Sequence, residues 1–132
     1  MEKYFRWIPI IQLLLLMIWF FMPWDFAYKN QADMALTWAG ANALLDRETT
    51  FVLSNFLTGI YAVAYIGLFF LQRWARILFL ILCIFGGFII PVYGISVQSG
   101  IESMLGYFMS LIDGVLIAVL YFTNASKKFN VN

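Results

Sequence analysis

The chain has 132 residues, of which 64% are hydrophobic, 20% are aromatic and only 11% are charged. A soluble domain is usually about 45–50% apolar and about 25% charged, so this chain has more apolar surface than a small core can bury. Its net charge of +1 gives no argument for nucleic acid as a partner. One cysteine, Cys83, and no histidine exclude an internal disulfide and the usual Cys/His zinc sites, and we expect neither metal nor cofactor. The composition indicates an integral membrane protein.

Four apolar runs are candidates for membrane spans, at residues 7–23, 51–71, 75–94 and 103–122. A helix needs about 20 residues to cross roughly 30 Å of hydrocarbon. The first run is the shortest, and the preceding Lys3 and Arg6 give it the look of a signal peptide. Bulky residues follow it instead of a small-residue cleavage site, so we interpret it as a retained helix. The expected fold is all-α, with four transmembrane helices in a single domain over residues 1–132.

The segment at residues 24–50 is the longest part of the chain between predicted spans, and we expect it to form an outer loop. Asp33 is a candidate N-cap for a short amphipathic helix that continues to about Leu45. Trp38 lies on its apolar face and is expected to anchor it at the membrane interface. Two interpretations remain open, a simple helical connector and an external lid or docking element. The following sequence DRETT is expected to cap the second span.

The basic residues predict the orientation in the membrane. All except Lys29 and Arg47 fall on one side of the predicted spans, namely Lys3, Arg6, Arg73, Arg76, Lys127 and Lys128. Basic residues are enriched on the cytoplasmic side of membrane proteins. Both termini are therefore predicted to be cytoplasmic, and we expect the protein in a bacterial inner (plasma) membrane.

One carboxylate, Asp113, lies near the middle of the fourth run. A charge at that depth costs about 2.5–3.5 kcal/mol on insertion scales, so its presence needs a reason. On a helical projection it shares a face with Glu102, Ser110 and Tyr121. No lysine or arginine lies deep in any predicted span.

The sequence is compatible with three roles for Asp113. In the first, Asp113 is protonated and holds helices together. In the second, it lines a water-filled cavity and meets ions or protons. In the third, it pairs with a basic residue on another subunit. The candidate hydrogen-bond partners and members of an ion or proton path are Gln12, Tyr61, Tyr65, Glu102 and Ser110.

Small residues mark the predicted helix-packing surfaces. In the fourth run they recur at every fourth position, a spacing that lets helix backbones approach closely within the monomer or between copies. The candidates are Gly106, Ser110, Gly114 and Ala118, together with Gly59 and Gly87 on the second and third runs. Pro91 is expected to bend or loosen the outer end of the third helix.

The sequence lacks the residue sets of the common enzyme sites. Only one carboxylate is deep in a span, and there is no Ser/His or Cys/His arrangement and no glycine-rich phosphate loop, so we expect no catalytic site. The leading hypothesis is a small homo-oligomeric inner-membrane protein that passes or gates ions or protons, or that perturbs the membrane as an effector. Asp113 would be its polar pivot and Glu102 a residue at the mouth. The alternative is a non-conducting accessory or regulatory subunit of a larger membrane complex, with a membrane subunit as its partner.

Overall fold

The structure is a computed structural model that describes residues 6–23, 43–94 and 98–123. All regular structure in these residues is helical, which confirms the predicted fold class for them. The elements are α2 (Trp7–Phe21), α4 (Arg47–Phe69), α5 (Arg73–Ile89), the 3-10 helix η2 (Ile90–Tyr93) and α6 (Gly100–Phe122). The predicted interfacial helix and its anchor Trp38 lie outside the described residues, except for residues 43–45, which are not helical.

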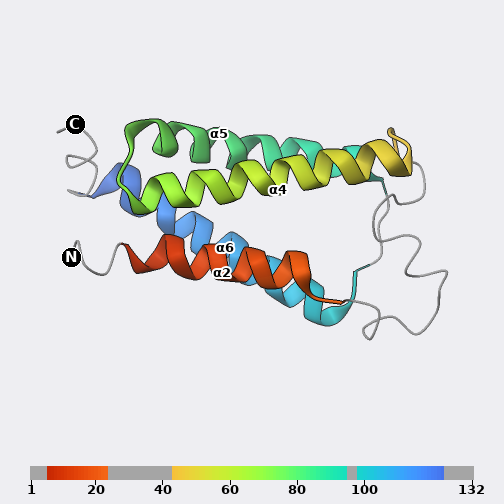
Figure 1. Ribbon diagram of the computed structural model, residues 1–132, viewed down its shortest axis with the longest axis horizontal. Coiled ribbons are helices and arrows are strands. Elements are labelled where there is room, and N and C mark those ends of the chain that lie inside the picture. Colours follow the sequence, from red (N-terminus) through yellow and green to blue (C-terminus); the bar gives the residue numbers. More distant parts are fainter. Residues whose placement is uncertain (1–5, 24–42, 95–97, 124–132) are drawn as a thin grey trace.

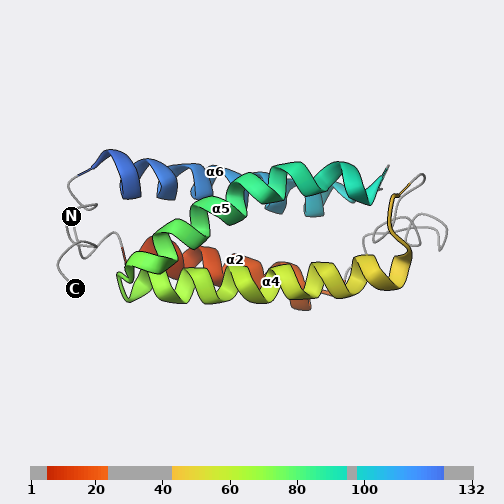
Figure 2. The same ribbon diagram turned by 90° about the horizontal axis from the view of Figure 1, so that it is seen from above.

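The helices run lengthwise beside one another in an elongated bundle (Figure 1). The start of α2, the turn between α4 and α5 and the end of α6 gather at one end, which we call the Arg73 end. The opposite end, where α4 begins, we call the Asp46 end. Figure 2 shows that α5 runs obliquely to α4, whereas in the view of Figure 1 the two helices share one layer and α2 and α6 share the other.

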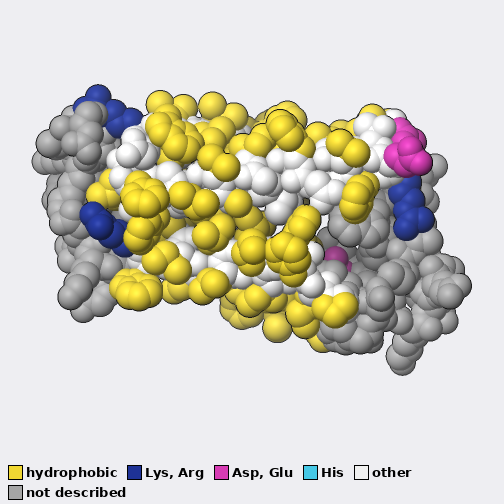
Figure 3. All heavy atoms as spheres, in the orientation of Figure 1, with side chains coloured by type: hydrophobic (Ala, Val, Ile, Leu, Met, Phe, Trp, Pro, Cys, Tyr) yellow, Lys and Arg dark blue, Asp and Glu magenta, His cyan; other side chains and the backbone are white. Residues whose placement is uncertain are grey.

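Three segments are long and apolar enough to cross a membrane. They are α4 with 23 residues, α5 with η2 at 21 residues, and α6 with 23 residues. Each exceeds the roughly 30 Å of a hydrocarbon core at about 1.5 Å per residue. The remaining predicted span is α2, an apolar helix of 15 residues. Hydrophobic side chains cover most of the visible face, whereas most of the charged side chains lie near its two ends (Figure 3). The chain is therefore an integral membrane protein.

The ends of the helices are set by local signals in the sequence. Asp46 is the N-cap of α4 and accepts hydrogen bonds from the Thr49 amide and hydroxyl at 3.1 and 2.6 Å, which confirms the predicted cap in DRETT. Ser99 and Glu102 form a capping box at the start of α6. The α-helical hydrogen bonding of α5 ends at Ile89, and the chain continues as the 3-10 helix η2, which contains Pro91. This break in the α-helix agrees with the predicted effect of Pro91 on this segment.

The turn between α4 and α5 is tight. The Gln72 amide donates to the Gly67 carbonyl at 2.9 Å, and the Leu71 amide donates to the Leu68 carbonyl at 3.0 Å. This is a Schellman pattern, and Leu71 takes its left-handed position with φ 57°. Gly67 is buried, and a Cβ added there would lie 2.6 Å from the Cβ of Ala75. The glycine therefore lets α4 and α5 approach each other directly after the turn.

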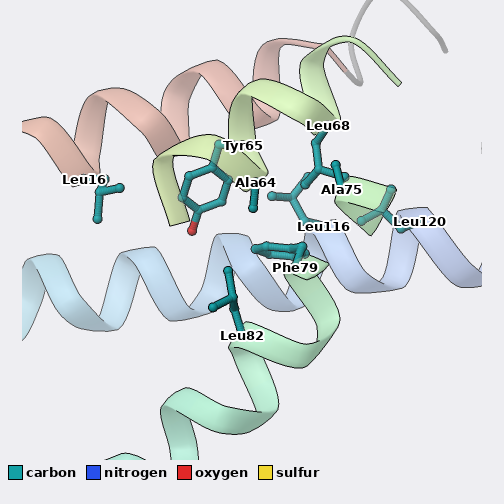
Figure 4. Packing of buried hydrophobic residues seen from close by; sticks show 9 residues of the cluster. All are labelled: Leu16, Ala64, Tyr65, Leu68, Ala75, Phe79, Leu82, Leu116 and Leu120. Carbon is teal, nitrogen blue, oxygen red and sulfur yellow. The ribbon is translucent and has the colours of Figure 1, made fainter. Parts of the chain in front are cut away.

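The buried core joins all four α-helices (Figure 4). Its members are Leu16 from α2, Ala64, Tyr65 and Leu68 from α4, Ala75, Phe79 and Leu82 from α5, and Leu116 and Leu120 from α6. The Tyr65 and Phe79 rings lie 5.6 Å apart between centroids. Most of these residues belong to the half of the bundle nearer the Arg73 end. The packing there fixes the position of Tyr65, whose hydroxyl points toward α6.

Candidate functional site

A hydrogen-bonded cluster joins three helices at Asp113. The Tyr65 hydroxyl of α4 donates to Asp113 Oδ1 at 2.9 Å, and Gln12 Nε2 of α2 donates to the same oxygen at 3.0 Å. Gln12 Nε2 also donates to the Met109 carbonyl at 2.9 Å. The Gln12 side chain is fully buried, so its amide faces these two acceptors without competition from solvent. Asp113 therefore lies at the contact of α2, α4 and α6.

Asp113 is near the middle of α6. At about 1.5 Å per residue it lies about 20 Å from the start of the helix and about 14 Å from the end. Among the described residues both hydrogen bonds to it end on Oδ1, and Oδ2 accepts none. Asp113 is half-buried rather than enclosed. One carboxylate oxygen is thus committed to the helix contact, and the other is available to a ligand.

A groove of about 280 Å³ leads from Asp113 toward the Asp46 end. Residues of α2, α4, η2 and α6 line it. They are Leu16 and Trp19; Ser54, Leu57, Thr58, Tyr61 and Tyr65; Tyr93; and Gly106, Met109, Ser110 and Asp113. Hydroxyl groups, aromatic rings and one carboxylate therefore share the same space. No lysine or arginine is among these lining residues.

Several hydroxyl protons of the groove are already used within the protein. Thr58 donates to the Ser54 carbonyl and Ser110 to the Gly106 carbonyl, both at 2.9 Å. Tyr61 donates to the Leu82 carbonyl at 2.7 Å. The Tyr65 hydroxyl donates to Asp113. These four hydroxyl groups therefore offer a ligand their oxygen lone pairs as hydrogen-bond acceptors. The groove is thus rich in acceptors.

The buried core closes the bundle between Asp113 and the Arg73 end. Ala64, Leu68, Phe79 and Leu116 are all fully buried there. Tyr121 strengthens this end, since its ring lies 4.9 Å from the Arg76 guanidinium carbon and its hydroxyl donates to the Arg76 carbonyl at 3.2 Å. In the described part of the chain, the groove at Asp113 therefore extends toward the Asp46 end, and the buried core lies on the side of the Arg73 end.

The structure places the predicted polar residues in two locations. Gln12 and Tyr65 bond Asp113, while Tyr61 and Ser110 line the groove. Glu102 is not among the groove-lining residues and belongs to the capping box of α6. There its Oε2 accepts a hydrogen bond from the Ser99 amide at 3.3 Å.

The predicted packing residues differ in their surroundings. Gly106 faces the Trp19 ring, because an added Cβ would lie 3.6 Å from it. A Cβ added at Gly59, Gly87 or Gly114 would have no described neighbour within 4 Å. The side chains of Ser110 and Ala118 are exposed. Among the small residues at every fourth position of α6, only Gly106 therefore packs closely against another helix within the described monomer, and a role of the others between copies stays a prediction.

The groove also contains residues that were not anticipated from the sequence, and Trp19, Ser54 and Tyr93 are those among them with polar or large aromatic side chains. A signal for one of them exists. Ser54, Thr58, Tyr61 and Tyr65 recur at helical spacing and form a polar stripe along α4. No comparable pattern marks Trp19 or Tyr93, which reach the groove only through the packing of α2 and η2.

Comparisons of the chain with protein-family models, with curated proteins and with solved structures give no match. The site must therefore be interpreted from its own chemistry.

Proposed function

We propose that this protein binds a proton or a cation at Asp113 and passes or gates its movement across the membrane. The observation that carries the proposal is a carboxylate at mid-helix that lines a groove with several hydroxyl groups, extends toward the Asp46 end and has one oxygen without a hydrogen bond among the described residues. A carboxylate in a span is costly, and such residues face protein interiors or water-filled paths where ions and protons move. The buried core on the other side of Asp113 favours a gated step over a permanently open pore.

The proposed setting is a bacterial inner membrane with the Arg73 end in the cytoplasm. Arg6, Arg73 and Arg76 belong to this end, and Arg47 belongs to the Asp46 end. This distribution supports the orientation by the positive-inside rule. In this arrangement α2 is the fourth span, and the groove opens to the outside.

The proposed working form is a homo-oligomer. The exposed Ser110, Gly114 and Ala118 support it, since small residues at this spacing favour close contact between helices. The same surface supports the second candidate, a non-conducting accessory subunit that docks on another membrane protein. In that case Asp113 would serve only to hold α2, α4 and α6 together.

Flux measurements in liposomes test the proposal. Purified protein is reconstituted at matched incorporation, and proton and alkali-cation flux are followed for the native chain and for Asp113→Asn, which preserves shape and hydrogen bonding but removes the ionisable group. Glu48→Gln removes one acidic residue from the exposed end of α4 and is the matched control. We expect flux with the native chain and with Glu48→Gln, and loss of flux with Asp113→Asn. Equal flux from all three, or none from any, contradicts the proposal.

A further inference from the structure

The groove at Asp113 combines features that a bare ion does not need. Four aromatic residues line it, namely Trp19, Tyr61, Tyr65 and Tyr93. The Tyr61 and Tyr65 rings lie 6.2 Å apart between centroids with a tilt of 33°. Apolar side chains from α2, α4 and α6 complete the walls. A cavity with apolar walls and a few convergent polar groups is typical of a site for an organic molecule.

The charge of the groove selects the sign of its ligand. Asp113 is the one ionisable carboxylate among the lining residues, and no lysine or arginine accompanies it there. Aromatic rings add to this preference, because their faces attract cations. The site is therefore suited to an organic cation rather than to an anion or a neutral solute.

The hydrogen bonds of the groove select the type of cation. The hydroxyl groups of Thr58, Tyr61 and Ser110 donate to backbone carbonyls, and the Tyr65 hydroxyl donates to Asp113. These oxygens and Asp113 Oδ2 therefore present acceptors to the groove. A protonated amine carries N–H donors that match them, whereas a quaternary ammonium ion has none.

We propose that the groove is a binding site for a protonated primary amine with a small apolar or aromatic body, whose ammonium group lies at Asp113 and whose body lies between the aromatic and apolar walls. The volume of about 280 Å³ accommodates a single-ring amine but leaves little room for a polycyclic one. The inference rests on the proposed function, since it names an organic substrate or effector for the same carboxylate.

Calorimetric titration of the detergent-solubilised protein tests the inference with three probes of similar body. Phenethylammonium supplies charge and N–H donors, benzyltrimethylammonium supplies charge without a donor, and benzyl alcohol supplies one O–H donor without charge. We expect phenethylammonium to bind the native chain about tenfold or more tightly than either of the others, the effect of a charge-assisted hydrogen bond. Asp113→Asn should weaken its binding by a similar factor, and Glu48→Gln should leave it unchanged.

Different results separate this inference from the proposed function. Equal binding of phenethylammonium and benzyltrimethylammonium, or no binding of phenethylammonium by the native chain, overturns the amine site without use of any variant. If Asp113-dependent proton flux persists without amine binding, the inference fails and the proposed function stands. If amine binds at Asp113 and no flux depends on that residue, the site is a binding site alone and the proposed function fails.

Discussion

The approach of α4 to α5 at Gly67 provides a sharp test of the packing that positions Tyr65. An alanine at this position would place its Cβ 2.6 Å from the Cβ of Ala75 and 2.8 Å from the Trp74 ring. Ordinary contact begins near 3.4 Å, so the Ala75 contact alone is short by about 0.8 Å. The Ala75 Cβ is fixed to its backbone and cannot rotate away, so the helices must separate. We expect Gly67→Ala to lower the free energy of unfolding by about 1–3 kcal/mol, as overpacking does in cores.

Gly59→Ala is the matched control for this change. Gly59 is in the same helix, and an added Cβ there meets nothing within 4 Å. Both variants gain the same helix propensity, about 1 kcal/mol in favour of alanine, so their difference isolates the contact with α5. The assay is reversible unfolding in mixed micelles, followed by far-ultraviolet circular dichroism at increasing fractions of denaturing detergent. If Gly67→Ala is as stable as Gly59→Ala, the close approach of α4 and α5 is refuted.

Three further predictions concern single hydrogen-bonding groups. Tyr65→Phe removes a donor to Asp113 and should cost about 1 kcal/mol in the same unfolding assay, whereas Tyr107→Phe, which is 65% exposed, should change stability by less than about 0.5 kcal/mol. Ser99→Ala removes half of the capping box and should cost about 1 kcal/mol, seen as faster amide exchange in the first turn of α6; equal exchange in Ser99→Ala and Ser103→Ala would contradict the cap. Hydrogen bonds from the Thr49 hydroxyl, and to a smaller extent from the Thr49 amide, hold the pKa of Asp46 below its ordinary value of 3.8. The stabilisation by this cap is therefore complete above pH 3.8 and is lost as the pH falls through the lower pKa of the folded state. The Thr49 amide resonance should accordingly titrate with a midpoint below 3.8 in the native chain and not at all in Asp46→Asn.

The helical architecture was predictable because its signals are local. Long apolar runs, the Asp46 cap and Pro91 each act on neighbouring residues, and the structure has helices or helix ends at these places. The boundaries shift by a few residues, since caps and not hydrophobicity end a helix. α6, for example, begins at Gly100 after the Ser99 cap rather than at residue 103.

The partners of Asp113 were only partly predictable. Tyr61 and Tyr65 are both candidate partners from the sequence, and counting residues from the membrane surface favours Tyr61, but Tyr65, one turn further along α4, makes the hydrogen bond. Residue counting ignores the tilt of the helices and the length of a tyrosine side chain. Gln12 could be named as a candidate, but its complete burial depends on three helices meeting around it, which no single helix encodes.

The contact at Gly67 and the groove itself depend on tertiary packing. Gly67 looks like any other small residue of α4, and its importance appears only beside Ala75. Trp19 and Tyr93 reach the groove from elements far apart in the chain. Hydrophobic patterning identifies which residues face lipid or protein, but it does not identify the neighbour that each face receives.

In the proposed function, water and solutes reach the level of Asp113 from the Asp46 end of the bundle. Substituted-cysteine labelling in a Cys83→Ser background tests it most directly, with Thr58→Cys in the groove and Val63→Cys on the exposed apolar face of the same helix. Thr58 lies about 17 Å from the start of α4, well within the span. We predict that a charged, membrane-impermeant thiol reagent labels Thr58→Cys from the side of the Asp46 end and leaves Val63→Cys unlabelled. An unreactive Thr58→Cys, or labelling only from the side of the Arg73 end, would contradict the account.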